Sequence, residues 1–208
     1  MKNCKSLLLA CLVTVLVLPL AVVGDASAQN LLTNPGFETG DLTGWNVFGI
    51  SGLSNVVVQS GDNGPSAPGT NVAFLENNAE GIALTLKQST PAGSASGAGT
   101  ATYSFDLLLG GAGLGGVFFV EVFAEQANGG VIAGSGVLGN YTPGNWTNFS
   151  GAFAVPANTD FLTIQLSAIT GAVVGGFSTM YADNVSLEFE GVVSTDETTW
   201  GNMKALYR

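Results

Sequence analysis

The chain has 208 residues, and its content of 46% hydrophobic and 10% charged residues excludes a disordered chain. It carries five Lys or Arg against 15 Asp or Glu, and this net charge of −10 repels phosphate backbones, so we expect no nucleic-acid partner. The absence of histidine excludes Ser-His-Asp and Cys-His catalysis, His-ligated zinc and imidazole acid–base chemistry.

Residues 1–28 have the pattern of a signal peptide. Lys2 and Lys5 precede an apolar run over residues 7–23, and the small residues 26–28 provide a cleavage site. An uncleaved membrane anchor is the alternative interpretation. A lipoprotein is not expected, because Cys11 lies too early in the apolar run. The pattern predicts an exported protein, either secreted or held at the cell surface.

The expected mature chain, residues 29–208, contains no cysteine, because Cys4 and Cys11 both lie in the leader. Its stability therefore has to come from a hydrophobic core, with a metal ion as a further contribution, and not from disulfides. We expect no membrane span in this part of the chain.

The pattern of residues 29–190 is that of short β-strands. Apolar and polar residues alternate in runs that are separated by Gly, Asn, Pro and Ser. We predict strands at 30–33, 45–49, 54–60, 71–76, 81–90, 100–110, 117–126, 131–138, 146–155, 160–170 and 179–190. So many strands with one buried face each predict a single all-β domain, a two-sheet antiparallel β-sandwich of the jelly-roll type.

Three segments carry a family resemblance. NLLTNPGFETGDLTGW at residues 30–45, NWTNFSGAFAVPANTDFLTIQL at 145–166 and MYADNVSLEF at 180–189 resemble strands of calcium-containing carbohydrate-binding modules. These modules have a galactose-binding-like jelly roll. The opening segment also resembles that of secreted bacterial proteins, including those with PEP-CTERM sorting tails. The resemblance spans residues 29–190 and implies a carbohydrate or glycan as the partner.

The same resemblance implies a structural calcium ion between the first and last strands. Glu38 and Asp183 occupy the matching positions, and backbone carbonyls near Asn34 and Gly36 would complete a set of six to eight oxygen ligands. The alternative is that the two acids cap turns.

Sugar binding requires an aromatic face with amides or carboxylates beside it. In the run 117–126, Phe118, Val120, Val122 and Ala124 form the core face, so the other face points outward. The five candidate ligand-binding residues are Phe119, Glu121 and Phe123 on that outer face, with Trp146 and Gln165 from other strands. Thr163 is a further polar partner beside Gln165. The alternatives are that a loop covers the two phenylalanines and that Trp146 packs at the sandwich edge.

Carboxylates are the remaining catalytic candidates. Glu121 and Glu125 share a strand face, but four residues separate them by about 13 Å, beyond the range of about 5–9.5 Å found in glycosidase pairs. Asp106 with Glu121 across neighbouring strands is conceivable. We predict a non-catalytic protein.

Residues 191–208 have the pattern of a linker and a short amphipathic helix. Ser194 and Glu197 form a capping box, and Trp200, Met203 and Leu206 follow at helical spacing. The helix either docks on the sandwich or serves as a tag for a cell-surface or sorting partner. The leading prediction is a glycan-binding module. The alternative is a surface or matrix protein that associates with itself through strand edges or this tail.

Overall fold

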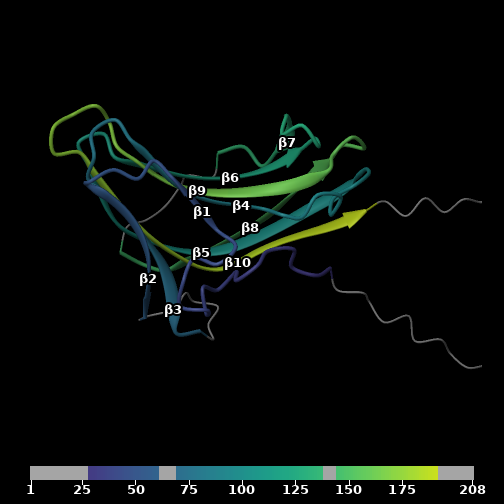
Figure 1. Cartoon of the computed structure of the whole chain (residues 1–208), viewed down its shortest axis with the longest axis horizontal. Coiled ribbons are helices and arrows are strands. Elements are labelled where there is room, and N and C mark those ends of the chain that lie inside the picture. Colours follow the sequence, from purple (N-terminus) through teal and green to yellow (C-terminus); the bar gives the residue numbers. More distant parts are fainter. Residues whose placement is uncertain (1–27, 61–68, 138–143, 192–208) are drawn as a thin grey trace, which may run out of the picture.

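The computed structural model describes residues 28–60, 69–137 and 144–191, which form two antiparallel sheets stacked face to face (Figure 1). The first sheet has the order β1 (Asn46–Phe48), β4 (Ala83–Ser89), β9 (Phe161–Ile169), β6 (Val117–Glu125) and β7 (Val131–Gly134). The second has the order β2 (Ser54–Ser60), β3 (Asn71–Asn77), β10 (Phe177–Gly191), β5 (Gly99–Gly113) and β8 (Thr147–Val155). This arrangement confirms the predicted all-β sandwich.

The core lies between the sheets and follows the predicted alternation. On β9, Leu162, Ile164 and Leu166 are completely buried, and on the neighbouring β6, Val120 and Val122 are too. Each such side chain contributes about 1.5–3 kcal/mol through burial. The same alternation turns the intervening side chains of these two strands toward the outer face of the first sheet.

β9 departs from the expectation of one buried face per strand. Its outer-face residues Thr163 and Ser167 are also buried, because β9 is the middle strand of its sheet. Their hydroxyls form hydrogen bonds with the hydroxyls of Ser89 (2.8 Å) and Thr85 (2.9 Å) on β4. The predicted polar partner Thr163 therefore has its hydroxyl engaged within the sheet.

The predicted strand at 30–33 is wrong, since these residues form no strand. The segment instead lies along β10, where the Leu31 N–H donates to the Leu187 carbonyl (2.9 Å). It then crosses to the first sheet, where the Thr33 N–H donates to Oε1 of Gln88 (2.5 Å). Because the segment forms hydrogen bonds with both sheets in turn, it does not form a continuous row of strand hydrogen bonds with either sheet. The other predicted strands are present. The one at 54–60 has the predicted bounds, the remaining ones have shifted ends, and the one at 131–138 ends at Gly134.

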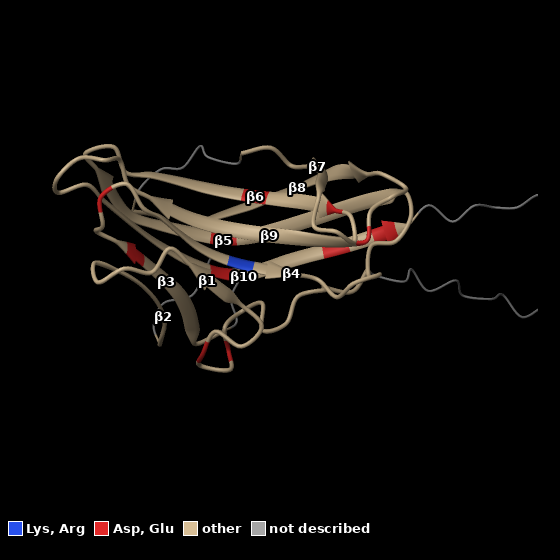
Figure 2. Cartoon of the chain, turned by 45° about the horizontal axis from the view of Figure 1, so that its top comes forward, with Lys and Arg blue, Asp and Glu red and all other residues tan. Residues whose placement is uncertain are grey.

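Acidic side chains are spread over the described part of the chain, whereas Lys87 on β4 is its only Lys or Arg (Figure 2). Within the described ranges, no helix is long and apolar enough to span a membrane. Apart from Ala28 and Gly191, the predicted leader at 1–28 and the predicted helix within 191–208 lie outside the described residues.

Candidate functional site

Four of the five predicted ligand-binding residues lie together on the outer face of the first sheet. β6 turns Phe119, Glu121 and Phe123 to this face, and each is half-buried. Gln165 of β9 is directly opposite Glu121, and its amide donates a 2.6 Å hydrogen bond to the Glu121 carboxylate. The bond leaves the other Glu121 oxygen and the Gln165 carbonyl as acceptors beside two aromatic rings.

The polar row extends across the sheet to its edge. Lys87 of β4 lies opposite Gln165, and Asn46 of β1 lies opposite Lys87. The Lys87 ammonium is 3.9 Å from Oε1 of Glu125, an ion pair at a distance too long for a hydrogen bond. Glu125 is almost fully buried, so its carboxylate is shielded from solvent. Glu121 is therefore the more accessible acid of β6.

A third aromatic side chain on this face, Phe48 at the end of β1, was not predicted from the sequence. It is 55% exposed and lies in one row across the sheet with Thr85, Ser167 and Phe119. Three strand spacings separate Phe48 from Phe119, or about 14 Å. Rings therefore lie at both ends of a row of hydroxyl groups.

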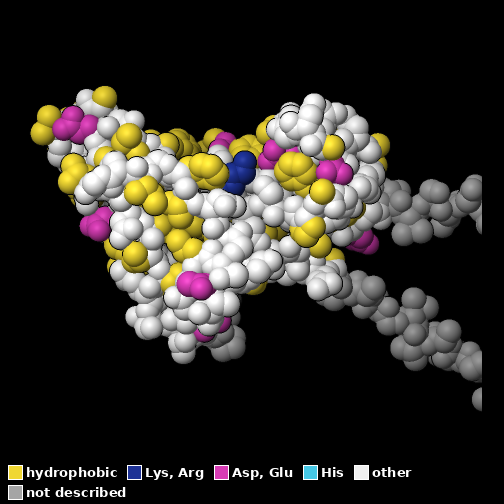
Figure 3. Space-filling view, in the orientation of Figure 1, with side chains coloured by type: hydrophobic (Ala, Val, Ile, Leu, Met, Phe, Trp, Pro, Cys, Tyr) yellow, Lys and Arg dark blue, Asp and Glu magenta, His cyan; other side chains and the backbone are white. Residues whose placement is uncertain are grey.

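The outer face of the first sheet is hollowed along the strands. In Figure 1 the loops at both ends of this sheet rise beyond its surface. The space-filling view in Figure 3 shows the same side of the molecule dished between two raised ends. A surface of this shape can receive an extended ligand that lies across the strands.

Phe123 closes one side of this face. It lies opposite Gly134 of β7, and a Cβ atom at position 134 would be 3.3 Å from its ring. The ring therefore lies against the glycine of β7, a neighbouring strand and not a covering loop, and is half-buried. Phe119 lacks this neighbour, since β7 ends opposite Phe123.

Trp146, the fifth predicted residue, lies elsewhere. It directly precedes β8 at the edge of the second sheet and is half-buried. Among the described residues, its indole Nε1 has no hydrogen-bond partner. The structure therefore does not bring Trp146 into the group formed by Phe119, Glu121, Phe123 and Gln165.

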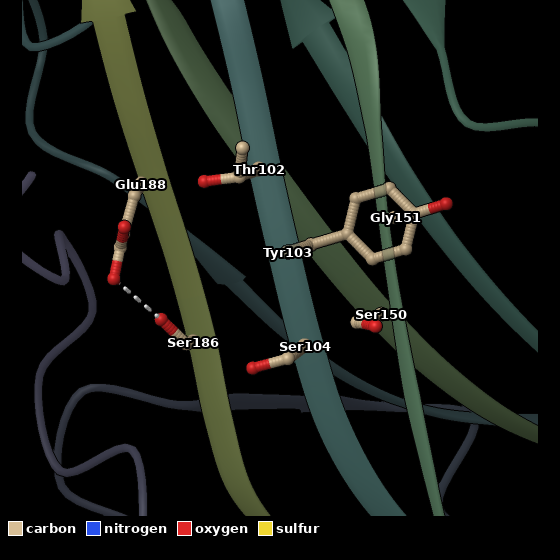
Figure 4. A pocket seen from close by; sticks show the side chains of 7 residues that line it. All are labelled: Thr102, Tyr103, Ser104, Ser150, Gly151, Ser186 and Glu188. Atoms are coloured by element: carbon tan, nitrogen blue, oxygen red, sulfur yellow. Dashed lines mark hydrogen bonds between the residues drawn. The ribbon is translucent and has the colours of Figure 1, made fainter.

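A polar groove of about 350 Å³ lies over the second sheet (Figure 4). Hydroxyl and carboxylate groups line it, and the Ser186 hydroxyl donates to the Glu188 carboxylate (3.2 Å). The ring of Tyr103 extends across Gly151 and is 9% exposed. The groove thus offers no open aromatic face, which is the feature that distinguishes the first sheet.

The predicted calcium ligands Glu38 and Asp183 both lie close to Gly36. A Cβ atom at position 36 would be 3.6 Å from Oδ1 of Asp183 and 3.7 Å from Cγ of Glu38. Glu38 accepts the N–H groups of Thr70 (2.8 Å) and Asn71 (3.0 Å), and these bonds hold the pKa of its carboxyl below the ordinary range. Within the described ranges, no three Asp, Glu, Cys or His side chains cluster, so carbonyl oxygens would have to supply the remaining ligands.

The conceivable acid pair of Asp106 and Glu121 is separated by the sandwich. Asp106 lies on β5 of the second sheet, where it is fully buried and accepts hydrogen bonds from Asn148 (2.7 Å) and Asn184 (2.9 Å). Glu121 lies on the outer face of the first sheet. These two carboxylates cannot act on one glycosidic bond.

No protein-family model matches the chain, and no curated protein matches it. Several solved structures match the chain. The enzymatically active domain of bacteriophage CBA120 tailspike protein 4 matches with a TM-score of 0.62 at 13% identity, over 77% of this chain and 21% of that chain. The CBM22-1 xylan-binding domain of Paenibacillus barcinonensis Xyn10C matches with a TM-score of 0.53 at 14% identity, over 80% and 98% of the two chains.

A third match is a structure of carbohydrate-binding modules from the β-sandwich superfamily, with a TM-score of 0.51 at 18% identity, over 77% of this chain and 63% of that chain. The chain spans about a fifth of the tailspike chain and nearly all of the xylan-binding domain. At these identities the likeness is one of fold, and it confirms the predicted resemblance to the jelly roll of carbohydrate-binding modules. Because the matches include an enzymatically active domain, the fold does not decide between binding and catalysis.

Proposed function

We propose that the protein is an exported, non-catalytic module that binds carbohydrate on the outer face of the first sheet. The observation that carries this proposal is the position of a bonded carboxylate–amide pair, Glu121 and Gln165, beside half-buried phenyl rings on a hollowed surface. The name of one matched structure, a xylan-binding domain, supports the same class of ligand.

The chemistry of a sugar ring fits this face. Its C–H groups form an apolar surface that packs on an aromatic ring, and its hydroxyls need donors and acceptors at the rim. Phe119 supplies the aromatic surface, while Glu121 and Gln165 supply acceptors in a fixed geometry. The second ring, Phe48, at the far end of the hydroxyl row favours a chain of several sugars over a single one.

The arrangement of acids favours binding over hydrolysis. Glycosidases need two carboxyl groups on opposite sides of one bond, about 5–9.5 Å apart. On this face, Glu121 is held by Gln165, and Glu125, four residues along the strand, is buried beside Lys87. A sugar on this face would therefore meet one accessible carboxylate.

Substitution of the aromatic residues tests the proposal. The wild-type protein should be retarded in native gels that contain a soluble polysaccharide, or should bind on a glycan array. Phe119→Ala and Phe48→Ala should each weaken that binding about two- to tenfold, since an aromatic stack contributes about 0.5–1.5 kcal/mol. Phe177→Ala is the matched control, because this residue is 40% exposed on the second sheet. Equal loss in all three variants, or binding by none including the wild type, would contradict the proposal.

We further propose that a structural calcium ion is held where the 34–38 loop meets β10. Atoms of both Glu38 and Asp183 lie within 4 Å of the Cβ position of Gly36, so the two acids are near each other, as ligands of one ion would have to be. Removal of calcium with a chelator should lower the melting temperature, and re-addition should restore it. Asp183→Asn should abolish that difference, whereas Glu190→Gln at the exposed end of β10 should keep it. A melting temperature insensitive to both chelator and calcium would exclude the ion.

A further inference from the structure

The two sheets differ in how their edges end. The edge strands of the first sheet, β1 and β7, have three and four residues. Those of the second sheet, β2 and β8, have seven and nine. An edge strand presents unpaired backbone N–H and C=O groups, and proteins that stay monomeric shorten, charge or distort such strands. The first sheet shows the short edges of that kind, and the second does not.

β8 lacks the charges and prolines that protect many edge strands. Its nine residues, TNFSGAFAV, include no charged residue and no proline. It pairs with β5 through nine consecutive residues without a register shift, whereas the β5–β10 and β6–β7 ladders each contain one or two shifts. A straight, regular, uncharged strand of this length is a template for another strand.

The side chains of β8 also permit close approach. On the outer face, Ser150, Ala152 and Ala154 are exposed and small. On the core face, Phe153 is only half-buried although it packs against the core, because β8 has a neighbouring strand on one side only. A strand added at this edge would complete the burial of that ring.

The lack of charge on β8 permits this edge to form a contact between copies. The chain carries a net charge of −10, so two copies repel each other in general. β8 has no charge, and the part of β5 that pairs with it contributes a single acid, Asp106, which is fully buried. A contact between β8 and β8 would therefore place no charged residue of β8 in the interface.

We propose that β8 pairs antiparallel with β8 of a second copy of this chain. The product is a closed twofold dimer in which the two second sheets form one continuous sheet of ten strands. The same surface serves both copies, so the contact is isologous and ends at two. A contact between β8 and β2 would instead be head-to-tail and would extend into a filament.

Paired substitutions on one face separate an edge contact from a general effect of charge. The variant A152K/A154K places two lysines on β8. Thr100 and Thr102 are the residues of β5 directly opposite Ala154 and Ala152, and they are exposed on the same face. The control T100K/T102K therefore adds the same charge one strand further in, away from the dimer contact.

Sedimentation velocity of the purified protein over a range of concentrations is the measurement. We expect a monomer–dimer equilibrium for the wild type and for T100K/T102K, and a dissociation constant at least tenfold higher for A152K/A154K. Hydrogen exchange supplies the second readout. Amide protons of residues 150–155 should become protected as the wild-type concentration rises, and those of β2 should not.

A wild-type protein that remains monomeric at every concentration, with no change in β8 exchange, would overturn the proposal. Equal dissociation constants for the two lysine variants would also overturn it, since the contact would then lie elsewhere. If the amide protons of both β2 and β8 became protected and the protein grew beyond a dimer, the contact would be a head-to-tail one between β8 and β2, and the proposal of a closed dimer would be wrong.

Discussion

Two glycines, one on an edge strand of each sheet, receive the rings of the aromatic residues opposite them. Phe123 leans over Gly134 on β7, and the ring of Tyr103 lies against Gly151 on β8. A Cβ atom at position 151 would be 2.6 Å from Cζ of Tyr103, closer than packed atoms approach. The absence of a side chain at these positions therefore determines where both rings lie.

We expect Gly151→Ala to destabilise the protein by about 1–3 kcal/mol, because the added methyl group displaces the Tyr103 ring from the core. The midpoint of urea-induced unfolding measures this change. Gly52→Ala is the matched control, since a Cβ atom there meets no atom within 4 Å. Similar midpoints for Gly151→Ala and the wild type would show that the ring moves aside without cost.

At the scale of the element, the 34–38 loop is bound to the start of β3 through one side chain. Glu38 accepts the N–H groups of Thr70 and Asn71 and the Thr70 hydroxyl (3.1 Å). The bond from Asn71 is the main reason that the pKa of Glu38 is lowered. A carboxyl with a depressed folded-state pKa stabilises the fold above its unfolded-state pKa, and this contribution is lost as the pH falls through the folded-state value.

We therefore expect Glu38→Gln to lower the melting temperature in calcium-free buffer near neutral pH and to have little effect in strongly acidic solution. The difference between variant and wild type should shrink as the pH falls below the ordinary range of a glutamate. Thermal unfolding followed by circular dichroism over that range is the measurement. A difference that stays constant with pH would assign the effect to packing rather than to ionisation.

Elements with long, regular alternation were predictable from the sequence. The pattern of β6 and β9 placed Glu121 and Gln165 on outer faces, and the structure shows that the two strands are neighbours in register. Phe48 was not predictable as part of the same face, because β1 has three residues and its position depends on pairing with β4. The local sequence does not determine which strand β1 pairs with. The separation of Trp146 from this group has the same origin, since strand order assigns β8 to the other sheet.

For the whole molecule, the charge distribution limits the kind of glycan that the proposed site accepts. Lys87 is the only Lys or Arg among the described residues, and it is paired with Glu125. The remaining accessible charge on this face, Glu121, is negative, as is the net charge of the chain. Carboxylated polysaccharides should therefore be repelled, and uncharged ones should not.

If the protein binds cellulose, we expect uncharged hydroxyethyl cellulose to bind more tightly than carboxymethyl cellulose. For any other polysaccharide that it binds, the uncharged form should likewise bind more tightly than the carboxylated form. The difference should narrow as salt is added, because screening weakens the repulsion. Glu121→Gln should further reduce the difference in affinity between the uncharged and the carboxylated polymer. Affinity electrophoresis at two salt concentrations measures both effects. Tighter binding of the carboxylated polymer would show that the site is not governed by this charge.

The stacking of the two sheets has a consequence for avidity. The hollowed face belongs to the first sheet, while the β8 edge belongs to the second, so strand pairing at β8 leaves the hollowed face uncovered. The twofold axis of such a dimer runs perpendicular to the joined sheet, and it therefore points both hollowed faces toward the same side. A dimer with two such weak sites binds a polymer surface about 10²–10⁴-fold more tightly than a single site does. The protein would then be retained on an insoluble polymer while releasing short soluble oligosaccharides of the same sugar.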